Sequence, residues 1–81
     1  MIINVSFYSY FKELTGVPGT SEQLPEGATL GELHLQLIEH FPKLGAMMNS
    51  TLLAVGVEYQ PRDHPLKEGD DVALFAPVQG G

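Results

Sequence analysis

The first residues of the chain alternate between apolar and polar side chains. Ile3, Val5 and Phe7 are apolar, polar residues separate them, and the alternation ends at Tyr8. A period of two is typical of a strand with one buried face. The pattern therefore predicts a strand here and places Tyr8 on the face that points away from the core.

Residues 10–24 contain two short predicted elements. The segment from Tyr10 to Leu14 has the composition of a single helical turn, which Gly16 and Pro18 then interrupt. The segment from Thr20 to Leu24 is predicted to form a second short strand. The chain thus begins with a hairpin-like unit.

The middle of the chain has the pattern of one amphipathic helix. Thr29 is followed three residues later by Glu32, the arrangement of a capping box at a helix start. Apolar residues then recur at spacings of three and four, which places them on one helix face. Pro42 disfavours regular continuation, so the predicted helix runs from Leu30 to Phe41. The apolar positions are Leu30, Leu33, Leu37, Ile38, Phe41 and Leu44.

The last third of the chain predicts two or three further strands. "LLAV" is typical of a strand, "GVE" turns the chain toward "YQ", and "KEGDD" forms a tight turn before "VALFA". The order is strand, strand, helix, then strands, with the helix covering one sheet face. The fold class is therefore α+β, in one domain over residues 1–81.

The sheet face opposite the predicted helix carries the clearer indication of function. If the last strand pairs with the first, Val72 and Leu74 face the helix and Phe75 joins Tyr8 on the other side. Two aromatic residues next to the end of the chain indicate a docking surface. The alternative is that a loop of the same chain covers this face.

Composition excludes several classes of function. The 81 residues include no cysteine, so neither a disulfide nor a thiolate nucleophile is available. A formal net charge of −6 disfavours binding to nucleic acid. No apolar run reaches the length of about 20 residues that spans a bilayer, and we expect a cytoplasmic protein that binds no membrane.

Side-chain catalysis and metal binding have little support in the sequence. His34 and His40 are six residues apart, which puts them on different helix faces, and we expect these histidines and His64 to be solvated or locally hydrogen-bonded. The acidic residues of the last third lie in turn sequence that favours aspartate and glycine for backbone reasons. They are Glu58, Asp63, Glu68, Asp70 and Asp71. No phosphate-binding glycine motif occurs.

The chain ends on "APVQGG", where Gly80 and Gly81 follow Pro77. The α-carboxylate of Gly81 becomes reactive only after conversion to an adenylate or a thiocarboxylate, which requires a second protein. Glycine suits a tail that enters a narrow channel, because it has no Cβ. The alternative is an ordinary frayed terminus. We expect residues 77–81 to form a flexible functional tail.

The quoted residues also carry a family resemblance. "LLAVGVEYQPRDHPLKEGDDVALFAPVQGG" and "SFYSYFKELTG" resemble the small subunit of molybdopterin synthase, a ubiquitin-like β-grasp sulfur carrier with one main helix on a mixed sheet. The family often has asparagine at the position of Gly56 and proline at that of Ala76. Neither difference removes the terminal chemistry.

The resemblance implies a function for the tail. An activating enzyme of the ubiquitin-activator type adenylates Gly81 with ATP and the terminus becomes a thiocarboxylate. The tail then donates sulfur to a cyclic pyranopterin monophosphate in the large subunit, with which the chain forms a heterotetramer. On this resemblance the chain binds no cofactor and is a non-catalytic, sulfur-donating subunit. The residues implied to contact these partners are Tyr8, Lys12, Tyr59 and Phe75.

Three alternatives remain open from the sequence. The thiamine-pathway sulfur carrier has the same fold and glycine ending. A ubiquitin-like modifier would be conjugated through Gly81 to lysines of other proteins. A plain interaction module would have a tail without chemistry. Activation of the terminus is common to the carriers and the modifier, so the residues alone do not separate them.

Overall fold

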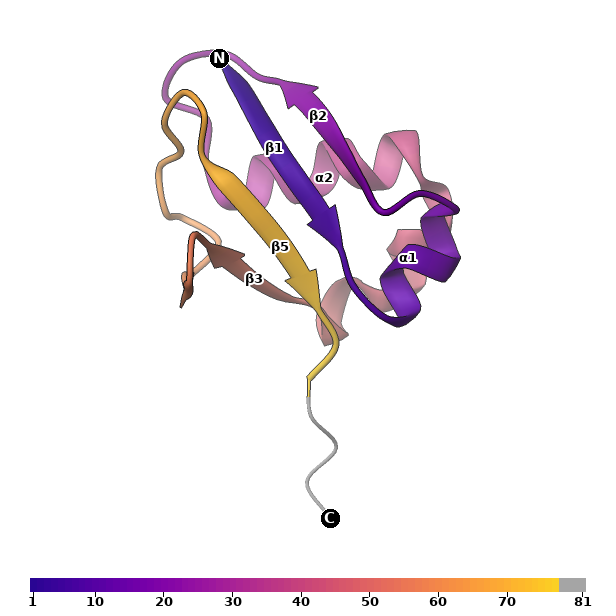
Figure 1. Cartoon of the computed structure of the whole chain (residues 1–81). Helices are drawn as coiled ribbons and strands as arrows, with labels where there is room; N and C mark the ends of the chain where they lie inside the picture. Colours follow the sequence, from indigo (N-terminus) through magenta and orange to yellow (C-terminus); the bar gives the residue numbers. More distant parts are fainter. Residues whose placement is uncertain (78–81) are drawn as a thin grey trace.

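The computed structural model describes residues 1–77, and its elements follow the predicted order (Figure 1). Five strands, two α-helices and a 3-10 helix make up this part of the chain. They are β1 (Ile2–Phe7), α1 (Tyr10–Thr15), β2 (Gly19–Gln23), α2 (Leu30–His40), η1 (Pro42–Ser50), β3 (Leu52–Val55), β4 (Glu58–Tyr59) and β5 (Asp71–Phe75).

The strands form one mixed sheet in the order β2-β1-β5-β3-β4. β1 and β5 are parallel, whereas the other neighbouring pairs are antiparallel. The first and last strands therefore lie side by side at the centre of the sheet, as predicted, and α2 lies across one face (Figure 1). Because β5 is bonded on both sides, the point at which the chain leaves the sheet is fixed.

The start of α2 is the predicted capping box. The Thr29 hydroxyl accepts a hydrogen bond from the Glu32 amide, and the Glu32 carboxylate accepts one from the Thr29 amide. The helix ends at His40, one residue before the predicted end, because Phe41 has left helical geometry ahead of Pro42. The 3-10 helix η1 was not predicted, because Pro42 and Gly45 interrupt the helical pattern and the segment ends on the polar residues Asn49 and Ser50.

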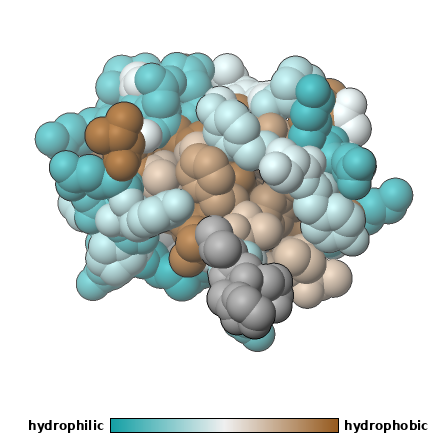
Figure 2. Space-filling model, turned by 60° about the horizontal axis from the view of Figure 1, so that its bottom comes forward, coloured by the Kyte–Doolittle hydropathy of each residue, from teal (hydrophilic) through white to brown (hydrophobic). Residues whose placement is uncertain are grey.

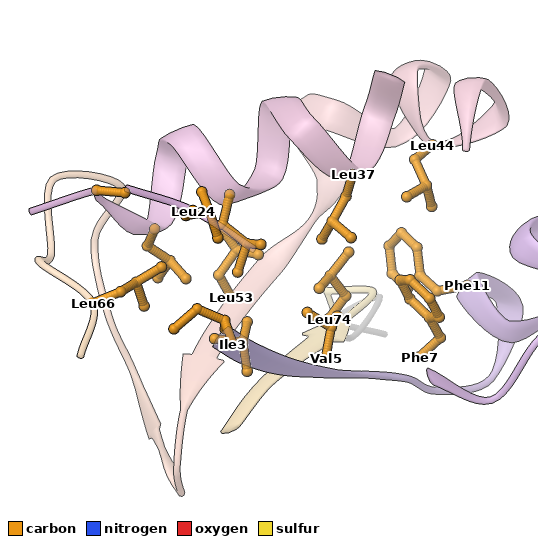
Figure 3. Packing of buried hydrophobic residues seen from close by; sticks show 14 residues of the cluster. Ile3, Val5, Phe7, Phe11, Leu24, Leu37, Leu44, Leu53, Leu66 and Leu74 are labelled. Atoms are coloured by element: carbon orange, nitrogen blue, oxygen red, sulfur yellow. The ribbon is translucent and has the colours of Figure 1, made fainter. Parts of the chain in front are cut away.

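The core lies between the sheet and α2 (Figure 3). Ile3, Val5 and Phe7 of β1 are buried, and Leu74 of β5 is fully buried beside them. Their side chains point toward Leu37 and its neighbours on α2 (Figure 3). The predicted assignment of the two sheet faces is confirmed.

Candidate functional site

Three aromatic rings lie together on the sheet face opposite α2. The rings of Tyr8 and Phe75 stack with their centroids 5.1 Å apart and their planes at 3°. Tyr59 packs its ring edge-on against Phe75, with the centroids 6.0 Å apart. We call Tyr8, Tyr59 and Phe75 the aromatic face. The structure thus brings together three of the four residues expected to contact a partner.

Strand register explains why distant residues meet here. Phe7 pairs with Leu74 across β1 and β5. The residues that follow them, Tyr8 just after β1 and Phe75 at the end of β5, therefore point to the opposite side. On the other side of β5, Leu52 pairs with Phe75 and is itself exposed. The end of the molecule at which β5 finishes carries a brown apolar region bordered by hydrophilic surface (Figure 2).

Tyr8 and Tyr59 are accessible to a partner. Their exposed fractions are 49% and 64%, whereas Phe75 is half-buried between them. An exposed aromatic cluster of this kind is a typical protein-binding surface. Among residues 1–77, no loop of the chain covers this face, because the side chains of Tyr8 and Tyr59 are exposed. The alternative of a covering loop is therefore wrong for these residues.

Lys12, the fourth expected contact, lies on α1 and is exposed. Its amide donates a hydrogen bond to the Ser9 carbonyl at 3.1 Å. Lys12 therefore lies on the helix that begins two residues after Tyr8 and is not part of the stack of rings.

The chain leaves the sheet directly beside the aromatic face. Ala76 and Pro77 follow Phe75 and are exposed. Gly80 and Gly81, the residues expected to carry the chemistry, lie outside the described residues. The structure therefore fixes the origin of the tail but not the position of its reactive group.

The expectation that His34 is solvated or locally bonded is wrong. His34 is fully buried in α2, and Arg62, 28 residues away, donates from Nη1 to His34 Nδ1 at 2.7 Å. Since arginine is only a donor, Nδ1 must be unprotonated and the imidazole neutral. Burial, and secondly the Arg62 charge, lower the pKa of His34 from 6.5 to about 4.

Sequence reasoning missed this contact because it joins a helix to a distant loop. Arg62 also donates from Nη2 to the Gly31 carbonyl, and the Gly31 amide donates to the Arg62 carbonyl. These bonds hold the loop after β4 against the start of α2. The loop follows Tyr59 directly, so they also limit movement at one edge of the aromatic face.

Three other titratable candidates make contacts within the fold. His40 is exposed and lies 2.8 Å from the buried Glu22 carboxylate, measured from Nδ1 to Oε1. Glu68 and Asp70 accept hydrogen bonds from the backbone amides of Ile2 and Lys67. Within residues 1–77, no group of three or more His, Cys, Asp or Glu residues is placed to hold a metal ion.

Across the described part of the chain, no helix combines the length and apolar character needed to traverse a lipid bilayer.

Comparison with known proteins gives consistent matches over the whole chain. Residues 5–81 match the model of the ThiS family. A Chlamydomonas reinhardtii protein named molybdopterin synthase sulfur carrier subunit is 35% identical over 83 residues, which cover 100% of both chains.

Solved structures show the same architecture. Small archaeal modifier protein 1 (SAMP1) from Haloferax volcanii has a TM-score of 0.90 at 20% identity, with both chains covered completely. The complex of subunits 1 and 2 of the molybdopterin-converting factor from Helicobacter pylori contains a chain with a TM-score of 0.71 at 22% identity, also with complete coverage. At these identities the likeness shows the fold alone. It confirms the predicted ubiquitin-like β-grasp.

Proposed function

Because this chain belongs to the ThiS family, we propose that it is a sulfur carrier protein and the small subunit of a molybdopterin synthase. The observation that carries the proposal is the end-to-end similarity to a relative of that name. The aromatic face beside the exit of the tail supports it, because a carrier must dock while its terminus reaches another protein's active site.

The chemistry proposed for the tail is carried by the carboxyl group of Gly81. A carboxylate does not transfer directly, because its leaving group would be oxide. The activating enzyme therefore joins it to the AMP part of ATP and releases pyrophosphate. A sulfur nucleophile then displaces AMP, and the terminus becomes a thiocarboxylate. This sulfur passes to a cyclic pyranopterin monophosphate, and hydrolysis restores the carboxylate.

The proposed partner in sulfur transfer is the large synthase subunit. The Helicobacter pylori neighbour was solved as a complex of two subunits, which supports pairing of this kind. Docking on the aromatic face would place the tail at the interface. In this arrangement the chain donates sulfur and the large subunit holds the active site.

The second proposed partner is an activating enzyme of the ubiquitin-activator type. This enzyme binds the same terminus before the large subunit does, so the two partners bind the tail one after the other. A formal net charge of −6 on the carrier favours basic surfaces around the channels that receive the tail.

The reach of the tail is compatible with this use. Residues 77–81 extend at most about 3.3–3.6 Å each, so five residues span no more than about 17 Å. The body of the carrier can therefore remain docked while the terminus enters a pocket. The rigid attachment of β5 between β1 and β3 fixes where that span begins.

Intact-mass spectrometry tests the proposal directly. After co-expression with the activating enzyme and a sulfur source, we expect replacement of one carboxyl oxygen by sulfur, a gain of about 16 Da. A chain without Gly81 is the control and should keep its unmodified mass. An unmodified mass for the full chain under active sulfur supply would contradict the carrier function.

The alternatives predict different products from the same terminus. The likeness to SAMP1 is a likeness of fold and does not indicate conjugation. A modifier would appear as adducts to lysines of other proteins. A thiamine-pathway carrier would show the same gain in mass of about 16 Da. It would not support conversion of the pyranopterin by the large subunit.

A further inference from the structure

The backbone at Ser9 has an unusual conformation. Its φ is 50° and its ψ is −123°, and it is the only residue other than glycine with positive φ among residues 1–77. These angles are close to the values of about +60° and −120° at the first central position of a type II′ turn. The Phe11 amide closes the turn on the Tyr8 carbonyl at 3.0 Å.

Glycine is the preferred residue at this position of the turn. A Cβ at positive φ crowds the neighbouring backbone, whereas glycine adopts the same angles without strain. The serine hydroxyl does not offset this cost by capping α1, since no side-chain hydrogen bond is made there. Ser9 is exposed to solvent. The conformation of the turn therefore does not explain why a residue with a hydroxyl group occupies position 9.

The position of the turn points to an interaction outside the chain. Ser9 follows Tyr8, whose ring stacks on Phe75, and the loop that contains it lies at the end of the sheet where β5 finishes (Figure 1). Protein interfaces surround apolar anchors with polar groups. Stacked rings give contact area but do not fix the rotation of a partner. A hydroxyl does, because it donates and accepts hydrogen bonds in defined directions.

We propose that the Ser9 hydroxyl is a specificity-determining contact, which hydrogen-bonds to a polar backbone or side-chain group of the large synthase subunit docked on the aromatic face. The turn presents the hydroxyl at the rim of that face, beside the origin of the tail. The contact then sets the orientation in which the tail enters the partner. This inference rests on the proposed function, because it requires a docked partner.

Two substitutions separate the backbone strain from the hydroxyl. Wild type and Ser9→Ala differ only in the hydroxyl, whereas Ser9→Ala and Ser9→Gly differ only in the Cβ. We expect Ser9→Gly to melt about 4 °C or more above Ser9→Ala, because the strain is removed. Both variants should bind the large subunit roughly 3- to 10-fold more weakly than wild type, the effect of one lost neutral hydrogen bond.

The measurements are thermal unfolding of the full chain and calorimetric titration with the large subunit. Ser21→Ala on β2 is the control and should leave affinity unchanged, because Ser21 pairs with Asn4 and not with a residue of the aromatic face. Wild-type affinity of Ser9→Ala would overturn the proposed contact. Equal melting temperatures of Ser9→Ala and Ser9→Gly would overturn the strain on which it rests.

Failure of this inference differs from failure of the proposed function. If wild type binds the large subunit and gains sulfur while Ser9→Ala does so equally well, only the role of Ser9 is lost. If wild type neither binds nor gains sulfur, the sulfur-carrier function is contradicted and the Ser9 contact is contradicted with it.

Discussion

The ring of Phe75 lies parallel to that of Tyr8, with 5.1 Å between the centroids, although 66 residues separate them in the chain. Their neighbours Phe7 and Leu74 pair in the same register and point into the core. Two adjacent residues of β5 therefore belong to different environments: Leu74 to the core and Phe75 to the aromatic face.

This relationship predicts opposite effects of two neighbouring substitutions. Phe75→Ala should weaken binding to the large subunit by about 1–3 kcal/mol while the chain stays folded, since it removes an interface anchor. Leu74→Ala should instead lower the free energy of unfolding by about 2–5 kcal/mol, because it leaves a cavity in the core. Titration calorimetry and urea unfolding measure the two effects. A large loss of stability with unchanged affinity for Phe75→Ala would show that the faces are assigned wrongly.

The length of the tail should matter more than its composition. Deleting Gly81 withdraws the reactive carbonyl by about 3.3–3.6 Å, enough to prevent productive attack in a fitted site. Gly81→Val keeps the length but adds a branched Cβ in a channel suited to bare backbone. Both variants, and one with an extra residue after Gly81, should fold and dock normally but lose function, most severely for the deletion. Pyrophosphate exchange and product formation measure activation and sulfur transfer separately.

Wild-type rates in both assays for the chain without Gly81 would show that the glycine terminus has no chemical role.

Acidification should destabilise the protein through His34. Burial, and then Arg62, hold its pKa at about 4, below the value of 6.5 expected in the unfolded chain. The unfolded state therefore binds a proton first, and the stability from neutral His34 is lost as pH falls from about 6.5 to about 4. Between pH 7.5 and pH 5 the loss should be about 2 kcal/mol. Urea unfolding at several pH values measures it.

His34→Gln is the control for this pH dependence. It removes the titrating imidazole, so its free energy of unfolding should fall less steeply over the same range. Equal slopes for the variant and wild type would show that other groups cause the effect.

Two glycines provide a matched test of the packing of the sheet. A Cβ on Gly19 would lie 2.6 Å from the Val5 carbonyl oxygen, a backbone atom that moves only if β1 or β2 shifts. Gly19→Ala should therefore lower the free energy of unfolding by about 1–3 kcal/mol. On Gly45 the nearest atom would be Ile38 Cγ2 at 3.5 Å, an ordinary contact. Gly45→Ala should leave stability unchanged or raise it slightly.

Thermal unfolding of the two variants measures the difference. If Gly19→Ala is as stable as Gly45→Ala, the close approach of β2 to β1 is not a constraint on this position.

Local pattern in the sequence determined the strands, the main helix and which of their faces are buried, although not the 3-10 helix η1. The alternation from Ile3 to Phe7 specifies a strand and its buried side, and the capping box with the apolar stripe specifies α2. These patterns can be recognised in the sequence because each depends on residues that are only a few positions apart. The terminal glycines and the family resemblance likewise indicated the chemistry of the tail without a structure.

Tertiary structure alone decided the contacts between distant segments. The packing of Tyr59 on Phe75 depends on β4 joining the sheet through β3, and the burial of His34 depends on Arg62 in another loop. The strained turn at Ser9 has no local sequence signal, because the surrounding elements impose its angles. The periodicity of apolar residues indicates which side of an element is buried. The contacts of each side chain depend on how all the elements pack together.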